Sequence, residues 1–214
     1  MRRWVGAARR PLAEGWLVLA PLAGLAAALA GRGHRTLTLL ALGTATAVAA
    51  ALRDPERTPP ATTDRALAPA DGRVVQIRRV EDAHFGVEMM EISIFLALWH
   101  VHVQRAPLAG RVTRVEVAPG GFRPALFAGA AENYRRTIYL ETEWGPCAVS
   151  QMAGLIARRI VGWVKPGENV FAGQRLGMIK FGSRVALRLP ATCRPLVGVG
   201  DVVRAGLTPI AARE

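Results

Sequence analysis

The sequence predicts a mainly β protein: a compact sandwich-like or barrel-like β domain, preceded by an N-terminal hairpin of two apolar helices. Two patterns carry this prediction. Near the N-terminus stand two apolar runs without charge, residues 15–30 and 36–52. From residue 53 onward the chain shows no long amphipathic helical pattern and breaks into short strand-like runs separated by glycine and proline. Many short strands at close spacing favour an all-β sandwich or barrel.

The two apolar runs are joined by a short polar turn at residues 31–35. As a helix, each run would be about 24–26 Å long, slightly less than the hydrocarbon thickness of a bilayer, roughly 30 Å. We therefore expect residues 1–53 to form a membrane-associated hairpin that either crosses the bilayer or lies in its interface. A cleaved signal peptide and a buried soluble helical pair stay open as alternatives. If the hairpin spans, the arginines before residue 11 favour a cytoplasmic N-terminus, which puts the chain after Arg53 on the same side.

Residues 53–64 contain three prolines and read as an extended linker. The β domain is then expected to fill residues 54–214. Its strand-like runs are residues 73–80, 91–103, 110–117, 137–141, 147–152, 160–164, 177–180 and 185–189. Two segments, residues 70–74 and 162–179, are similar to the hairpins of the hammerhead fold of lipoyl and biotinyl domains. The modified lysine of those domains is missing, because Lys165 lies directly before Pro166.

The net charge of +12 is shared evenly, with +6 on residues 1–53 and +6 on the remainder. Such a charge suits an anionic membrane surface or an acidic substrate. No basic run is interleaved with aromatic residues, which argues against a nucleic-acid partner. The two cysteines, Cys147 and Cys193, lie far apart, and no His/Cys group has zinc-ligand spacing. We expect two reduced thiols and no metal site.

The most informative dipeptide is Gly182-Ser183, which follows an apolar strand-like run. A serine after glycine has a carbonyl in its own backbone that its hydroxyl can attack, which converts the amide into an ester. β-Elimination then breaks the chain, and the new N-terminal residue hydrolyses to a pyruvoyl group, a ketone that acts as an electron sink. Glycine leaves the attack unhindered because it has no Cβ. Alone, however, a Gly-Ser dipeptide is also an ordinary turn.

Two histidines end the run at residues 91–103. Read as one strand, it places residues 92, 94, 96, 98, 100 and 102 on a single face, because side chains alternate along a strand. Both faces of the run are apolar, which is typical of a buried central strand. His100 and His102 would be costly there without partners, so each is either a satisfied structural histidine or part of a site.

In order and spacing, the chain resembles the short proenzyme form of the phosphatidylserine decarboxylase family over roughly residues 50–190. The segments that carry the resemblance are residues 53–57 (Arg-Asp-Pro-Glu-Arg), 68–74 (with Ala-Asp-Gly), 99–107 (with Val-His-Val), 151–160 and 181–184 (Phe-Gly-Ser-Arg). Two residues depart from the family pattern. Gln104 stands where asparagine is expected, and His100 where a small polar or acidic residue is expected.

The resemblance implies the residue roles. Ser183, His102 and Asp71 match a triad in which His102 accepts the serine proton and Asp71 orients the imidazole. Cleavage between Gly182 and Ser183 would give fragments 1–182 and 183–214, with the pyruvoyl cofactor at the former Ser183. Asp71 is followed by glycine, and an ordinary Asp-Gly turn is the alternative for it.

The resemblance also implies the reaction and its partners. The ketone would form a Schiff base with the amine of phosphatidylserine and release CO₂, giving phosphatidylethanolamine. His100 is a candidate for protonating the carbanion or contacting the carboxylate, and Arg105 for meeting the lipid phosphate. The expected partners are the membrane lipid surface and a heterodimer of the two fragments, with further oligomerisation open. The expected location is the cell membrane, with the catalytic domain on the cytoplasmic side.

Two other functions stay open from the residues. One is a non-enzymatic, membrane-anchored adaptor with a lipoyl- or biotinyl-like domain. The other is a soluble hydrolase that uses Ser183, His102 and Asp71 without breaking its own chain. The hydrolase lacks Gly-x-Ser-x-Gly, because Arg184 and Val185 follow the serine.

Overall fold

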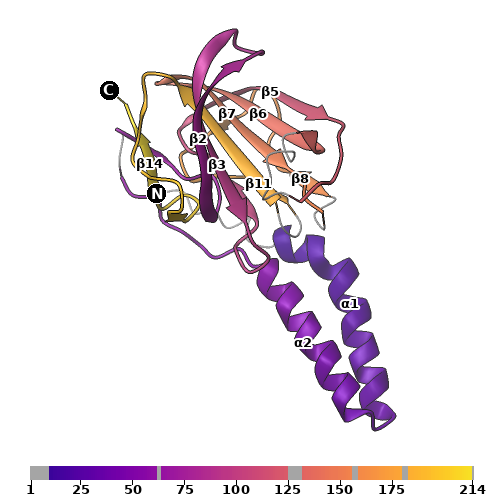
Figure 1. Ribbon diagram of the computed structural model, residues 1–214. Helices are drawn as coiled ribbons and strands as arrows, with labels where there is room; N and C mark the ends of the chain where they lie inside the picture. Colours follow the sequence, from indigo (N-terminus) through magenta and orange to yellow (C-terminus); the bar gives the residue numbers. More distant parts are fainter. Residues whose placement is uncertain (1–9, 62–63, 125–131, 156–158, 180–182, 214) are drawn as a thin grey trace. The chain divides into compact units, whose positions relative to one another are not determined.

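The computed structural model describes residues 10–61, 64–124, 132–155, 159–179 and 183–213. By its internal contacts the chain divides into two compact units, Met1–Glu56 and Arg57–Glu214. The first unit holds both helices, and the second holds all the described strands (Figure 1).

The N-terminal unit contains α1 (Arg10–Gly31) and α2 (Arg35–Ala51), which pack against each other. The turn between them is closed at the end of α1. Gly33 has a left-handed φ of 75°, its amide donates to Ala30 O at 3.0 Å, and the His34 amide donates to Leu29 O at 3.0 Å. Paired hydrogen bonds of this kind around a left-handed glycine end many helices. The two helices therefore lie where the sequence places them. Within the described residues, however, neither is long and apolar enough to cross a membrane.

The β unit consists of one large antiparallel sheet and two small ones. The large sheet has eight strands and curls (Figure 1). Its strands, in spatial order, are β13 (Val202–Val203), β2 (Gly72–Asp82), β3 (Val87–Leu96), β11 (Ser183–Pro190), β7 (Gly145–Met152), β6 (Arg135–Thr142), β5 (Gly110–Ala118) and β9 (Asn169–Val170). One small sheet has the order β4 (Val103–Arg105), β10 (Arg175–Ile179) and β8 (Ile160–Gly162). The other has the order β1 (Arg65–Leu67), β14 (Pro209–Ala212) and β12 (Arg194–Pro195).

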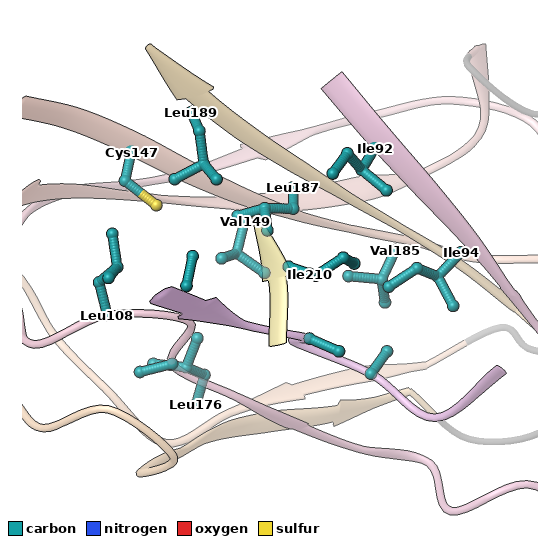
Figure 2. Packing of buried hydrophobic residues seen from close by; sticks show 14 of the residues in the cluster. Ile92, Ile94, Leu108, Cys147, Val149, Leu176, Val185, Leu187, Leu189 and Ile210 are labelled. Atoms are coloured by element: carbon teal, nitrogen blue, oxygen red, sulfur yellow. The ribbon is translucent and has the colours of Figure 1, made fainter. Parts of the chain in front are cut away.

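The hydrophobic core lies between the large sheet and the short strands that face it. Alternate residues of the central strands point inward: Ile92, Ile94 and Leu96 of β3, and Val185, Leu187 and Leu189 of β11, all of them fully buried. Figure 2 shows Ile94 of β3 and Val185 and Leu187 of β11 together with Ile210 of β14 and Leu176 of β10, which come from the opposite layer. The predicted mainly β domain is confirmed, and the curl of its main sheet makes it half of a barrel.

One predicted strand is wrong in its extent. The run at residues 91–103 does not continue as a single strand: β3 ends at Leu96, and the chain turns before β4 begins at Val103. The turn is closed by two local hydrogen bonds, from the His100 amide to Ala97 O at 3.0 Å and from the Ala97 amide to His100 Nδ1 at 3.1 Å. His100 and His102 therefore do not share a strand face with Leu96, since the backbone reverses before it reaches them.

The outer face of the large sheet carries a buried ionic cluster. Arg188 of β11 donates to Asp82 at 2.8 Å and to Glu91 at 2.9 Å, and Arg78 donates to Glu91 at 2.8 Å. Burial pushes the pKa of Asp82 upward. The hydrogen bond from Arg188 and the amides of Phe85 and His84 outweigh burial, so the pKa of Asp82 lies below its ordinary value. The cluster therefore stabilises the fold in the ionised state of Asp82.

The variant Asp82→Asn is expected to lower the free energy of unfolding by about 1–3 kcal/mol at neutral pH, because Arg188 loses an ionised partner. The contribution of Asp82 is fully present above pH 3.8, its ordinary pKa, and is lost as the pH falls through the lower pKa of the folded protein. Urea denaturation between pH 7 and pH 3 measures it. The difference between wild type and variant should shrink below about pH 4, and a constant difference would contradict this account.

Candidate active site

Ser183 is the first residue of β11 and lies at the edge of the hydrophobic core. It pairs with Leu96, the last residue of β3, and its side chain shares the inward face of β11 with Val185. Ser183 is fully buried, and its Oγ has no hydrogen-bond partner among the described residues. A buried hydroxyl without a partner is costly and rare, and it is typical of functional sites. Gly182, the other half of the predicted cleavage site, lies outside the described residues.

His102 comes from the opposite layer of the domain. It directly precedes β4 and is 1% exposed. Its carbonyl accepts two hydrogen bonds, from the Ile179 amide at 3.1 Å and from Gln104 Nε2 at 2.8 Å. Ile179 ends β10 four residues before Ser183, and four residues of chain span at most roughly 14 Å. The His102 backbone, the predicted base, is therefore hydrogen-bonded to a residue that lies only four positions before Ser183, the predicted nucleophile.

The strand register shows that this is one end of the large sheet. Arg184 lies opposite both Phe95 of β3 and Met152 of β7, and Phe95 also lies opposite Arg73 of β2. The starts of β2 and β11 and the ends of β3 and β7 thus lie at the same end of the sheet. Segments that are far apart in the sequence meet there because the strands are antiparallel.

Asp71 lies at the same end of the sheet, directly before β2. Gly72, beside it, packs so closely on β3 that a Cβ would come within 2.2 Å of Phe95 O. The Asp71 carboxylate accepts from both terminal nitrogens of Arg57, at 2.8 Å for Nη2, and from the Ala205 amide at 2.8 Å. The described partners of Asp71 are thus Arg57 and Ala205, and His102 is not among them. The predicted contact between Asp71 and His102 stays a prediction.

The two residues predicted to meet the substrate have different surroundings. His100 is half-buried in the turn after β3, beside the exposed Leu98 and Trp99. Because His100 Nδ1 accepts the Ala97 amide, the ring proton is on Nε2. Arg105 is buried in β4 and donates from Nη1 to Gly173 O at 3.1 Å, which gives it a structural role. Contact of either residue with a substrate stays a prediction.

A hollow lies on the outer face of the large sheet, away from Ser183. It has a volume of about 620 Å³ and includes the ionic cluster of Asp82, Glu91 and Arg188, together with Tyr139. Neither Ser183 nor His102 lines it. No cluster of three or more metal-ligating side chains occurs among the described residues.

Sequence reasoning missed the polar residues that support the site. The sequence marks Arg57 only as part of the linker and of the family-like segment at residues 53–57, whereas in the structure it neutralises Asp71. The side chains of Arg136, Gln151 and Gln104 form a buried hydrogen-bonded series that ends at the His102 carbonyl. A weak signal existed for Gln151, a large polar residue within the apolar strand-like run at residues 147–152. Its partners are 15 and 47 residues away in the sequence, which no local pattern reveals.

The family of the chain follows from comparisons with known proteins. A family model described as phosphatidylserine decarboxylase matches residues 45–211. The chain belongs to the phosphatidylserine decarboxylase family. It is 42% identical over 164 residues to a phosphatidylserine decarboxylase proenzyme of Burkholderia multivorans, covering 76% of this chain and 77% of that protein. It is 42% identical over 161 residues to the protein of the same description in Paraburkholderia xenovorans, covering 74% and 76%.

The family match spans both sides of the Gly182-Ser183 bond and includes Asp71 and His102. The predicted resemblance to phosphatidylserine decarboxylases is therefore confirmed. The comparisons give no support to a non-enzymatic adaptor with a lipoyl- or biotinyl-like domain.

The pairing of Arg57 with Asp71 is expected to be essential for stability. The two side chains are 8% and 11% exposed, so the variant Arg57→Met leaves a buried carboxylate without its counterion. Removing one partner of a buried pair costs about 3–5 kcal/mol, and urea denaturation measures this loss.

The control is Arg79→Met, because the pair of Arg79 with Glu88 is 65% and 54% exposed. An exposed pair contributes about 0–1 kcal/mol. Equal destabilisation by the two variants would show that Arg57 does not hold Asp71 in the way the geometry indicates.

Proposed function

We propose that this chain is a self-processing, pyruvoyl-dependent decarboxylase that converts phosphatidylserine to phosphatidylethanolamine and CO₂. The observation that carries the proposal is the buried Ser183 Oγ, which has no hydrogen-bond partner among the described residues and lies at the expected cleavage position of a phosphatidylserine decarboxylase family member. The buried His102 is tied to the strand end that leads into Ser183, which supports its role as the base.

In the first stage of processing, Ser183 Oγ attacks the carbonyl carbon of Gly182, and His102 accepts the hydroxyl proton. The Gly182–Ser183 C–N bond breaks, the amine of Ser183 takes up a proton, and an ester joins Gly182 to the serine oxygen. Asp71 is the candidate for orienting the imidazole and stabilising its charged form, in addition to its described contacts with Arg57 and the Ala205 amide. The buried setting favours this chemistry, since water at the site would hydrolyse the ester.

In the second stage, a base removes the Cα proton of Ser183 and the Cβ–O bond breaks, which releases the Gly182 carboxylate. The remaining dehydroalanine tautomerises to an imine. One water then adds and ammonia leaves, so that a pyruvoyl group caps the fragment that begins at residue 183. No oxidant or reductant is needed.

The surroundings of Ser183 fit such a group. Elimination removes Oγ and leaves Cβ as the apolar methyl of the pyruvoyl group, and Ser183 Oγ is buried with no hydrogen-bond partner among the described residues, so no polar contact there is lost. When present, the pyruvoyl group supplies the electron sink that decarboxylation of an amino acid headgroup requires. His100, with its proton on Nε2, is the candidate for delivering a proton after CO₂ leaves. Arg105 is the candidate for the lipid phosphate.

The two cleavage fragments, 1–182 and 183–214, are proposed to stay together as a heterodimer. β11 belongs to the smaller fragment and pairs with β3 on one side and β7 on the other, both from the larger fragment. Its inward residues Val185, Leu187 and Leu189 are fully buried in the shared core. Separation would expose this apolar surface and the edges of both neighbouring strands.

The N-terminal unit is proposed to attach the enzyme to the cell membrane, with the catalytic domain on the cytoplasmic side. α1 and α2 expose large apolar side chains, among them Trp16, Leu39 and Leu40. An apolar hairpin that rests in the lipid interface brings the β domain to its lipid substrate. The hairpin of β8 and β10 in the β domain is proposed to correspond to the hammerhead-like element expected for residues 162–179.

Intact mass spectrometry of the purified protein tests the proposal. Wild type should give two fragments that divide between Gly182 and Ser183, the smaller one with a carbonyl that borohydride reduces. Ser183→Ala should stay a single chain, since it has no nucleophile. His102→Ala should cleave about 10²–10⁴ times more slowly, the usual contribution of a positioned base. Only cleaved protein should release CO₂ from vesicles that contain phosphatidylserine.

The control is Ser93→Ala, which removes another buried serine hydroxyl from the neighbouring strand β3. It should cleave like wild type. An identical fragment pattern for wild type, Ser183→Ala and His102→Ala would refute self-processing at this site. An uncleaved wild type that hydrolyses esters would favour the Ser/His/Asp hydrolase instead.

A further inference from the structure

A series of buried side-chain hydrogen bonds crosses the interior of the β unit and ends at His102. Arg136 Nη1 donates to Gln151 Oε1 at 3.0 Å, and Gln151 Nε2 donates to Gln104 Oε1 at 2.7 Å. Gln104 Nε2 then donates to the His102 carbonyl at 2.8 Å. Gln104 and Gln151 are fully buried, and Arg136 is 7% exposed. Polar groups at this depth are stabilising only when every link is made.

The direction of the series is fixed by its first member. An arginine can only donate, so Gln151 must turn its oxygen toward Arg136 and its nitrogen toward Gln104. Gln104 must then accept with its oxygen, which leaves its nitrogen for the His102 carbonyl. Arg136 has no acidic partner among its described contacts, which are Gln151 and the Val164 carbonyl at 3.0 Å. A buried cation without a carboxylate is costly, which indicates that its role is to orient these amides.

Two glycines make the room that the series needs. Gly162 of β8 and Gly177 of β10 are register partners in the small sheet. A Cβ on Gly162 would come within 2.3 Å of the Arg136 guanidinium, and a Cβ on Gly177 would come within 3.0 Å of Gln151 Nε2. The small sheet therefore leaves an opening through which side chains of the large sheet reach across to β4.

The series joins the large sheet, which carries Ser183, to the small sheet of β4, which follows His102. Gln151 of β7 lies opposite Val185, which is two residues from Ser183 on the same inward face of β11. Gln104 of β4 is two residues from His102. The hydrogen bond between the two glutamines is therefore a cross-link between the sheets, placed next to both reacting residues.

We propose that Gln151 and Gln104, oriented by Arg136, are positioning residues for self-cleavage: they hold the His102 backbone at a fixed distance from Ser183. This inference rests on the proposed function, in which Ser183 and His102 react. The Ile179 amide and Gln104 Nε2 together occupy both lone pairs of the His102 carbonyl, so the backbone of the base is held from two sides. Misplacement of a reacting group by about 1 Å costs on the order of a hundredfold in rate.

The sharpest variant is Gln151→Glu. The new carboxylate keeps the contact with Arg136 as an ion pair, so the fold should be retained. It has no proton to donate to Gln104, however. The Gln104 side-chain oxygen must then face either the new carboxylate or, if the amide flips, the His102 carbonyl. Both arrangements weaken the hold of Gln104 on His102. We expect a folded protein with a self-cleavage rate constant reduced about tenfold to a hundredfold, more than its loss of melting temperature explains, measured on freshly synthesised proenzyme by denaturing gel over time.

Thr137→Val is the matched control. Thr137 and Ser150 are hydrogen-bonded at 2.9 Å on the same two strands, β6 and β7, directly next to Arg136 and Gln151 but on the outer face. This variant removes a buried polar contact without touching His102, and it should cleave at the wild-type rate. If the glutamines had a purely structural role, the cleavage rates of Gln151→Glu and Thr137→Val would fall in proportion to their losses of melting temperature.

Gln104→Met and its combination with Gln151→Met provide a second measurement. If both glutamines act through one hydrogen bond, the double variant should cleave no more slowly than the slower single variant. Wild-type cleavage rates for Gln151→Glu, or for Gln104→Met if Gln151→Glu is unstable, would overturn the inference. The inference would also be overturned if Gln104→Met and Thr137→Val lost the same melting temperature and slowed self-cleavage to the same extent. A wild type that does not cleave would instead refute the proposed function itself.

Discussion

The pairing of β11 with β3 and β7 is the constraint on which the site depends. It fixes Ser183 at a strand start, opposite Leu96, with its side chain turned into the core. The preceding strand, β10, belongs to a different sheet and ends at Ile179, four residues before Ser183. Because β10 and β11 are both held by strand pairing, the predicted reacting groups cannot lie far apart, which favours a reaction between neighbouring groups of the chain itself.

The same arrangement explains how a cleaved chain stays folded. The break is expected directly before β11, so the described pairings of β10 and of β11 lie on opposite sides of it. The strand that follows the break is central, and its inward residues are part of the core. The two fragments are thus proposed to separate in covalent terms only, while the hydrogen bonds of β11 and the apolar contacts of Leu187 and Leu189 continue to hold them.

The sequence predicts the features that arise from local pattern and misses those that arise from long-range polar contacts. Apolar runs and short alternating segments give the two helices and most strands, and Gly182-Ser183 indicates the chemistry. The strand predicted to reach Val103 ends early because the His100 side chain caps a turn, which hydrophobic periodicity does not report. The partnership of Asp71 with Arg57 and the glutamine series depend on tertiary placement, so they emerge only from the structure.

The central claim is that the oxygen of Ser183 itself breaks the chain. Protein synthesised with serine labelled by ¹⁸O in the hydroxyl group tests it most directly. Because the ester forms through Ser183 Oγ and elimination breaks the Cβ–O bond, the label should appear in the new C-terminal carboxylate of Gly182 in the larger fragment. A Gly182 carboxylate that instead carries only unlabelled oxygen, with the label kept in a serine at residue 183, would mean ordinary hydrolysis and would contradict the account.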